Sequence, residues 1–253
     1  MNKGIIVASF GTTHEDTRKK TIENIENKIV KAFPDFHVMR AFTSRMVINR
    51  LKKNDNIKVF NEKEALMEME SLGINREDIY IQPLHIIPGF EYEKLVKLDQ
   101  VHISKPLLYN KSCIEEIIDT MDFNISKDEQ LVLFGHGSSH EKDDFYQMFN
   151  NLLQSKGYHN IFMVTAEGEI TIDDIIPKLK ENGLKKIVLQ PFMIVAGDHA
   201  KNDMASDDED SLKSILEKEG FEVEPRLIGL GEYDFICDMY IERLEESMAE
   251  KGE

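Results

Sequence analysis

The sequence predicts an α/β protein of two similar halves, each a doubly wound parallel sheet with helices, separated by a cleft. Short apolar segments alternate along the chain with longer segments whose apolar residues recur at helical spacing, as Ile22, Ile25 and Ile29 do. The order of these segments in the first half repeats in the second. The polar stretch 124–130 separates the two series, so we expect the halves to comprise residues 1–124 and 125–253.

Apolar runs bounded by polar residues predict the strands, and helical spacing predicts the helices between them. In the first half we expect strands at 4–10, 36–42 and 79–86, a short extended piece at 106–109, and helices near 13–32, 45–53, 62–71 and 91–99. In the second half we expect strands at 131–135, 161–165, 187–194 and 221–227, and helices at 140–154, 171–181, 203–219 and 233–248. Such alternation is typical of a parallel sheet covered on both faces.

Three pairs of segments resemble each other between the halves, in the same order. Residues 79–89 align with 187–197 at an offset of 108, and residues 10–15 align with 136–141 at an offset of 126. Residues 39–44 match 163–168 more loosely, at an offset of 124. A repeat of this length indicates a duplicated domain rather than a solenoid.

Charge and composition narrow the classes of partner. The formal net charge of −16 argues against nucleic acid and against an anionic membrane surface. No apolar run approaches the roughly 20 residues that a transmembrane helix needs, and the first ten residues resemble a strand more than a signal peptide. We therefore expect a cytoplasmic protein, with its two distant cysteines reduced and a homo-oligomer left open.

The two halves differ at three loop positions that follow strands. His136 lies opposite Phe10, Glu167 opposite Thr43, and His199 opposite Glu91. Ligands bind at the carboxyl ends of strands in open parallel sheets. Two imidazoles and a carboxylate suit a borderline divalent metal such as Co²⁺, Fe²⁺, Ni²⁺ or Zn²⁺, with coordination positions left open.

Each of these residues also has a simpler interpretation. His136 can be a loop histidine that the backbone satisfies, His199 can neighbour a helix starting near residue 202, and Glu167 can be solvated. Their spacing matches no short metal-binding signature, so the residues alone leave both interpretations open.

A family resemblance covers residues 4 to about 245. The sequence resembles the anaerobic cobalt chelatases of cobalamin biosynthesis, most specifically in residues 196–208, AGDHAKNDMASDD, and also in Phe10-Gly11-Thr12, residues 40–44, 84–87 and 91–94, and Gly135-His136-Gly137. Members of that family are lyases with the two-domain class II chelatase fold, and they insert Co²⁺ into the tetrapyrrole sirohydrochlorin without ATP. The resemblance implies that His136, Glu167 and His199 bind the metal, with His136 and His199 catalytic.

The resemblance also implies how this chain would meet its substrates. Co²⁺ would be a substrate, with Fe²⁺ and Ni²⁺ as alternatives and no organic cofactor. We expect His199 and Glu167 to hold the ion while His136 accepts a pyrrole proton. The expected substrate-binding residues are Phe10, Gly11, Thr12, Arg45 and His85, the last with a simpler interpretation as a satisfied core histidine.

Sirohydrochlorin is a polycarboxylate, so an acidic chain needs a local cationic rim to bind it. The candidate cations are Arg40, Arg45, Arg50 and Lys201. The acidic residues at 203 and 207–210 are expected to supply negative charge at a helix N-terminus.

Two other functions stay open at the level of sequence. One is a ferrochelatase of the same fold, acting in sirohaem or protohaem synthesis, because His and Glu ligands accept Fe²⁺ as readily as Co²⁺. The other is a tetrapyrrole or metal carrier without turnover.

Overall fold

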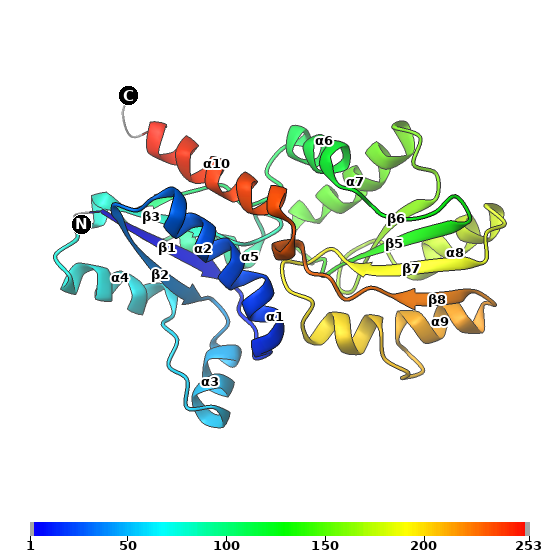
Figure 1. Ribbon diagram of the computed structural model, residues 1–253, viewed down its shortest axis with the longest axis horizontal. Coiled ribbons are helices and arrows are strands. Elements are labelled where there is room, and N and C mark those ends of the chain that lie inside the picture. The colour runs from blue at the N-terminus through cyan, green and yellow to red at the C-terminus, as the bar shows by residue number, and fades with distance from the viewer. Residues whose placement is uncertain (1–2, 251–253) are drawn as a thin grey trace. The chain divides into compact units, whose positions relative to one another are not determined.

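The computed structural model describes residues 3–250 and divides the chain into two compact units, each an α/β sandwich (Figure 1). The first unit is discontinuous: it comprises the chain up to Tyr109 and the segment that begins at Gly231. The second unit is Asn110–Leu230. This division differs from the expected boundary at 124/125. The second unit begins earlier, and the C-terminal helix belongs to the first unit.

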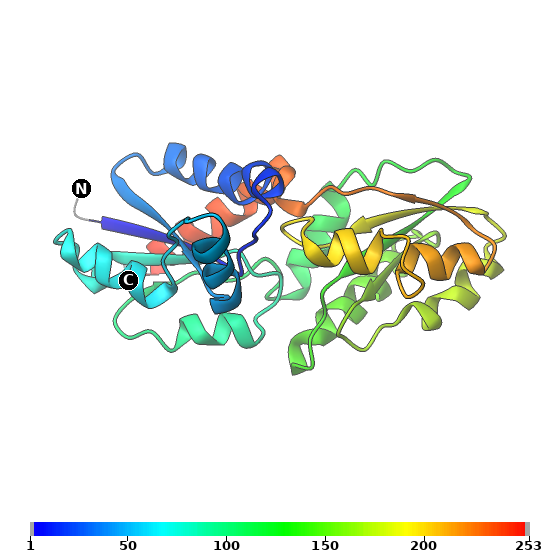
Figure 2. The same cartoon turned by 90° about the horizontal axis from the view of Figure 1, so that it is seen from below.

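The first unit contains a four-stranded parallel sheet of order β2-β1-β3-β4. Its strands are β1 Lys3–Ser9, β2 Phe36–Phe42, β3 Ile79–Pro83 and β4 His102–Ile103. Its helices are α1 Glu15–Lys20, α2 Ile22–Ala32, α3 Arg45–Asn54, α4 Glu62–Ser71, α5 Phe90–Val96 and α10 Asp234–Glu250. Helices α2 and α10 lie side by side (Figures 1 and 2), and Asn24 of α2 donates a hydrogen bond to the Gly231 carbonyl just before α10 (3.0 Å).

The second unit repeats this topology, with a parallel sheet of order β6-β5-β7-β8. Its strands are β5 Glu129–Gly135, β6 Ile161–Thr165, β7 Lys186–Pro191 and β8 Glu222–Pro225. Its helices are α6 Lys111–Thr120, α7 Asp144–Ser155, α8 Ile172–Glu181 and α9 Leu212–Lys218. The common strand order confirms the predicted duplication and the predicted fold class.

The strand registers correct one of the three alignments between the halves. In the first sheet Ser9 pairs with Phe42, and in the second sheet Gly135 pairs with Thr165. These pairs relate β2 to β6 by 123 residues, so the alignment at 124 was wrong by one residue, while the offsets of 126 and 108 hold. The position equivalent to Glu167 is therefore Ser44 rather than Thr43. A slip of one residue moves every side chain of a strand to the opposite face, so the correction matters.

Helix α6, which was not expected from the sequence, accounts for the different boundary. Asn110 caps this helix by accepting a hydrogen bond from the backbone N–H of Cys113 (3.0 Å). Its buried face packs against α7 of the second unit, and Asp119 pairs with Lys156 just beyond α7 (2.6 Å). An N-cap asparagine followed by an apolar stripe was the sequence signal for this helix.

Three other segments differ from expectation. The helix expected at 13–32 is broken at Thr21, against which the backbone of Gly231 packs so closely that a Cβ there would lie 2.9 Å from the Thr21 Cα. The extended piece expected at 106–109 is instead β4, at His102–Ile103. The segment 205–210 is not helical, because α9 begins only after its cap Ser211, so most of the acidic run does not occupy a helix N-terminus.

Within residues 3–250, no helix combines the length and the apolar character needed to cross a membrane. The longest helix, α10, buries Tyr240 and Leu244 completely in the first unit.

The assignment of α10 to the first unit can be tested by truncating one buried side chain. Leu244→Ala removes a fully buried side chain, which typically costs about 2–5 kcal/mol. Amide hydrogen exchange of the variant should lose protection in β1, β2 and β3, while β5, β6 and β7 keep theirs. The matched control Leu153→Ala, equally buried in α7, should show the reverse pattern. Loss of protection first in the second unit on Leu244→Ala would contradict the assignment.

Candidate metal centre

Two glycines bracket His136 at the carboxyl end of β5, and neither tolerates a side chain. A Cβ at Gly135 would lie 2.7 Å from the Tyr146 ring, and one at Gly137 would lie 2.4 Å from the Gly168 nitrogen. Gly137 also has a positive φ of 73°. Glycine is therefore required for the loop after β5 to approach the loop after β6 this closely.

Backbone hydrogen bonds hold these two loops in register. The Ala166 N–H donates to the Gly135 carbonyl (3.0 Å) and the Glu167 N–H donates to the His136 carbonyl (2.8 Å), which extends the β5–β6 ladder beyond both strands. Glu167 is therefore fixed next to His136. Its carboxylate oxygen lies 4.0 Å from the His136 Nδ1.

His199 comes from a third loop, after β7, and its ring contacts the His136 ring. The two ring centroids are 4.6 Å apart and the rings are nearly perpendicular, at 86°. His199 immediately precedes a turn of π-helix at Ala200–Met204, and its Nδ1 lies 2.6 Å from an oxygen of Asp203. π-Helical turns occur frequently at functional sites.

The hydrogen-bond partners indicate which nitrogen of each imidazole is protonated. The Nδ1 of His136 is 2.9 Å from the Gly137 carbonyl, and the Nδ1 of His199 faces the Asp203 carboxylate. Both partners are acceptors, so in the neutral rings Nδ1 carries the hydrogen and Nε2 carries the lone pair. Both side chains remain about 40% exposed, so Nε2 of each can accept a proton or bind a metal. His136 makes the backbone contact expected of a simple loop histidine, but through Nδ1, so Nε2 is not used by that contact.

The structure brings the His136 ring into contact with the His199 ring and places the Glu167 carboxylate 4.0 Å from the His136 Nδ1. Among residues 3–250 no three His, Cys, Asp or Glu side chains are already placed to hold one ion together. The use of all three residues as ligands stays a prediction. Asp203 was missed as a partner, although its spacing of four residues from His199 on a helical segment was a usable signal.

The expected substrate-binding residues Phe10, Gly11 and Thr12 form the loop after β1 of the first unit. Phe10 is 46% exposed, whereas Thr12 is buried and its hydroxyl accepts a hydrogen bond from the His14 N–H. Gly11 has a φ of 93°, and a Cβ there would lie 2.5 Å from the Phe42 ring. The loop is thus held tightly over Phe42 and presents the Phe10 ring outward.

Arg45 already has a carboxylate partner. Its guanidinium donates two hydrogen bonds to Glu62, one of them 2.8 Å long, and a third to the Thr43 carbonyl. Burial disfavours the charged form of Glu62, but the hydrogen bonds and charge of Arg45, the Glu62 backbone N–H and the charge of Lys63 together outweigh it and lower the pKa of this carboxyl. Arg40 is likewise paired, with Glu26 and Glu23. Binding of substrate carboxylates by Arg45 stays a prediction.

His85 follows β3 and is an unusual histidine. The residue is partly exposed as a whole, yet both of its ring nitrogens are buried and have no hydrogen-bond partner in the part of the chain that the structure describes. Burial lowers its pKa from 6.5 to about 4, against the opposing field of Glu91. His85 is therefore neutral at pH 7, and it is not the satisfied core histidine of the simpler interpretation.

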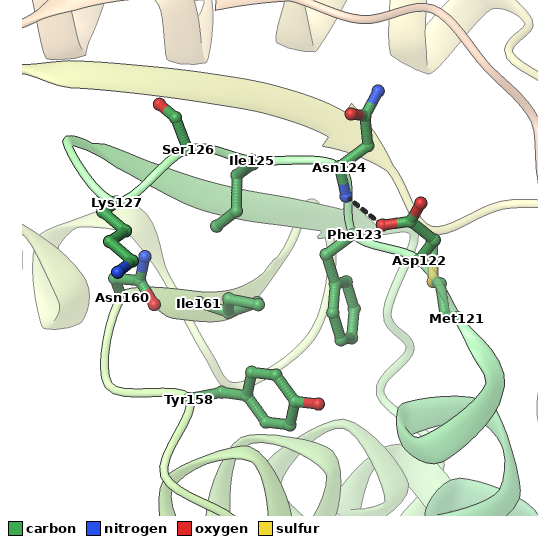
Figure 3. A pocket seen from close by; sticks show the side chains of 10 residues that line it. All are labelled: Met121, Asp122, Phe123, Asn124, Ile125, Ser126, Lys127, Tyr158, Asn160 and Ile161. Atoms are coloured by element: carbon green, nitrogen blue, oxygen red, sulfur yellow. Dashed lines mark hydrogen bonds between the residues drawn. The ribbon is translucent and has the colours of Figure 1, made fainter.

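A pocket of about 320 Å³ lies near the amino ends of strands β5 and β6 (Figure 3). Its lining residues lie before β5 and before or at the first residue of β6, whereas His136 and Glu167 follow those strands. Phe123 and Tyr158 face each other in it with ring centroids 5.5 Å apart. No histidine or cysteine lines this pocket, so it is separate from the candidate metal centre.

The fold and the imidazole pair at the strand ends define a two-unit α/β protein of the chelatase type. The structure of SirB from Bacillus subtilis with Fe³⁺ superposes with a TM-score of 0.64 and 14% identity, covering 100% of this chain and 98% of that chain. At this identity the likeness shows the fold alone.

Sequence comparison identifies the family. Residues 3–249 match the cobalt chelatase (CbiK) family, and the chain belongs to it. It is 33% identical to the sirohydrochlorin cobaltochelatase of Salmonella typhimurium over 98% of this chain and 97% of that protein. It is 29% identical to the sirohydrochlorin cobaltochelatase CbiKC of Nitratidesulfovibrio vulgaris over 98% of this chain and 91% of that protein. Family membership favours the cobalt chelatase interpretation over the ferrochelatase and the carrier.

The lowered pKa of His85 predicts how stability depends on pH. Between pH 6.5 and about 4 the unfolded chain binds a proton at His85 that the folded protein does not, so the free energy of unfolding falls as the pH falls through this range. The loss attributable to His85 is at most on the order of 3 kcal/mol. His85→Gln should flatten the curve of unfolding free energy against pH in urea titrations between pH 7 and 4.5. Parallel curves for the wild type and the variant would show that His85 is protonated normally.

Proposed function

We propose that this protein inserts Co²⁺ into sirohydrochlorin without ATP, and that the reaction takes place at His136 in the second unit. The observation that carries the proposal is the pair of contacting imidazoles, His136 and His199, whose Nδ1 atoms are both engaged by acceptors. The Nε2 lone pair of each imidazole then has no role in these contacts, and both side chains are about 40% exposed. This donor set suits a metal that must be held and later released to another ligand, because positions are left open.

The three residues have different surroundings, and these suggest a division of roles. The carboxylate of Asp203 faces the Nδ1 of His199 and fixes the orientation of its ring, as carboxylates commonly do behind metal-binding histidines. The Nδ1 of His136 contacts the neutral Gly137 carbonyl (2.9 Å), and the Glu167 carboxylate lies farther from it, at 4.0 Å. We therefore assign metal binding to His199 and Glu167, and acceptance of a pyrrole proton to His136, which can also bind the ion.

The first unit supplies side chains suited to the tetrapyrrole. Phe10, Met46 and Phe90 follow β1, β2 and β3, and each is about half exposed. Exposed apolar side chains in the loops that follow parallel strands are suited to contact with a flat ring. Neutral His85 would meet the ring as an uncharged imidazole rather than pair with a substrate carboxylate.

The proposal treats Co²⁺ as a substrate and invokes no organic cofactor. Fe²⁺ and Ni²⁺ are the alternative metals that the same ligands accept. An absorbance time course with sirohydrochlorin and each metal in turn tests this choice. Faster insertion of Fe²⁺ or Ni²⁺ than of Co²⁺ would contradict it. The cytoplasmic location and the oligomeric state remain proposals from the sequence.

The role of His136 predicts a separation between insertion and tetrapyrrole binding. His136→Ala should slow Co²⁺ insertion by at least about 10²–10⁴-fold, the usual effect of losing a general base. Tetrapyrrole affinity should be largely retained, because the ring is held by other side chains. Insertion is followed by absorbance, and affinity by titration of the same proteins without metal.

The matched control is His159→Ala. His159 is exposed and lies just before β6, at the opposite end of this strand from Glu167. This variant should insert Co²⁺ at the wild-type rate. Equal insertion rates for the wild type and His136→Ala would exclude the proposed mechanism.

The contact between His199 and Asp203 predicts a loss of metal affinity. Asp203→Ala should weaken Co²⁺ binding roughly 10–100-fold, measured by calorimetric titration without tetrapyrrole, because partners behind a metal-binding histidine typically contribute this much. Asp207→Ala is the matched control: it removes the same charge from the same acidic run, but Asp207 pairs with Lys213 and is solvated. Equal losses in both variants would mean that general acidity, rather than the His199 contact, attracts the ion.

A further inference from the structure

A buried carboxylate lies behind the candidate metal centre, at the residue immediately before α7. Asp143 is only 5% exposed. Its Oδ1 accepts a hydrogen bond from the Ser138 N–H (2.8 Å), and its Oδ2 accepts one from the Glu169 N–H (3.0 Å). The carboxylate thus joins two loops that are about 30 residues apart in the sequence.

Each loop carries one of the expected metal ligands at the same distance from its anchor. Ser138 lies two residues after His136, and Glu169 lies two residues after Glu167. Between them, a Cβ at Gly168 would lie 2.4 Å from the Asp143 Oδ2. The absence of a side chain at Gly168 is what lets the carboxylate reach both loops.

We propose that Asp143 is a positioning residue that sets the separation of His136 and Glu167, an inference that rests on the proposed use of both as metal ligands. The extended β5–β6 ladder fastens the loops on the side of the strands, at His136 and Glu167 themselves. Asp143 fastens them two residues further on. Hydrogen bonds to an ionised acceptor are about twice as strong as neutral ones, so this second fastening restricts the loops more than a neutral side chain would.

Asn150, a buried polar residue on α7, serves as a control that distinguishes positioning of the loops from ordinary structural support. Asn150 is 8% exposed and makes two hydrogen bonds to one backbone residue: it donates to the Met163 carbonyl (2.9 Å) and accepts from the Met163 N–H (2.7 Å). Met163 lies in the middle of β6, away from both loops. Asp143 and Asn150 therefore make equal numbers of backbone hydrogen bonds, and only Asp143 contacts the ligand-bearing loops.

The experiment compares Co²⁺ affinity and thermal stability in the full chain for the wild type, Asp143→Ala, Asp143→Asn and Asn150→Ala. The titrations use Co²⁺ alone. Asp143→Ala should weaken Co²⁺ binding about 10–100-fold, since removal of groups that orient metal ligands typically has this effect. Asp143→Asn keeps one acceptor oxygen and should have an intermediate affinity. Asn150→Ala should lower the melting temperature as Asp143→Ala does, yet bind Co²⁺ like the wild type.

Two results would overturn the inference: wild-type Co²⁺ affinity in both Asp143 variants, or an equal loss of affinity in Asn150→Ala. If Asp143→Ala does not fold, the comparison of Asp143→Asn with Asn150→Ala decides. Insertion into sirohydrochlorin, measured on the same proteins, keeps this inference distinct from the proposed function. A wild type that binds Co²⁺ without inserting it would refute the proposed function, and the affinities would still decide the role of Asp143.

Discussion

The candidate metal centre depends on one constraint, the continuation of the parallel β5–β6 ladder beyond the ends of both strands. Two backbone hydrogen bonds, from Ala166 to Gly135 and from Glu167 to His136, carry the pairing into the loops. Gly137 allows the two backbones to approach this closely, because a Cβ there would lie 2.4 Å from the Gly168 nitrogen. The 4.0 Å separation of the His136 and Glu167 side chains follows from this backbone geometry. Loops are usually variable, and here backbone pairing fixes the positions of two candidate ligand residues.

The same backbone device occurs in the first unit with different side chains. There the Thr43 N–H donates to the Ser9 carbonyl and the Ser44 N–H donates to the Phe10 carbonyl. Phe10 and Ser44 thus occupy the positions of His136 and Glu167. The equivalent positions thus carry different side chains in the two units. The first unit has an exposed aromatic ring and a hydroxyl, and the second has an imidazole and a carboxylate. Function has diverged through side chains, while the strand-end geometry has been kept.

How much the sequence predicted follows from which interactions are local. Most of the strands, the common topology of the two halves and the three loop positions after strands were predictable, because apolar periodicity and the repeat report on them directly. Most partners of the candidate site residues were not, although Asp203 lies only four residues from His199 and left a usable signal. Glu62 pairs with Arg45 across 17 residues, and Asp143 reaches Glu169 across 26, so neither contact leaves a local pattern. The alignment of β2 with its counterpart β6 also required the structure, because a loose sequence match can be shifted by one residue.

The charges of the first unit bear on how an acidic chain would bind a polycarboxylate. Arg45 is half exposed, but its partner Glu62 is almost completely buried. If Arg45 turned to a substrate carboxylate, Glu62 would remain as an unpaired buried charge, which typically costs about 3–5 kcal/mol. Arg45 can therefore contribute only through N–H groups that point away from Glu62. Exposed apolar side chains such as Phe10 and Phe90 meet no such cost, so we expect them to hold the tetrapyrrole more strongly than the arginines do.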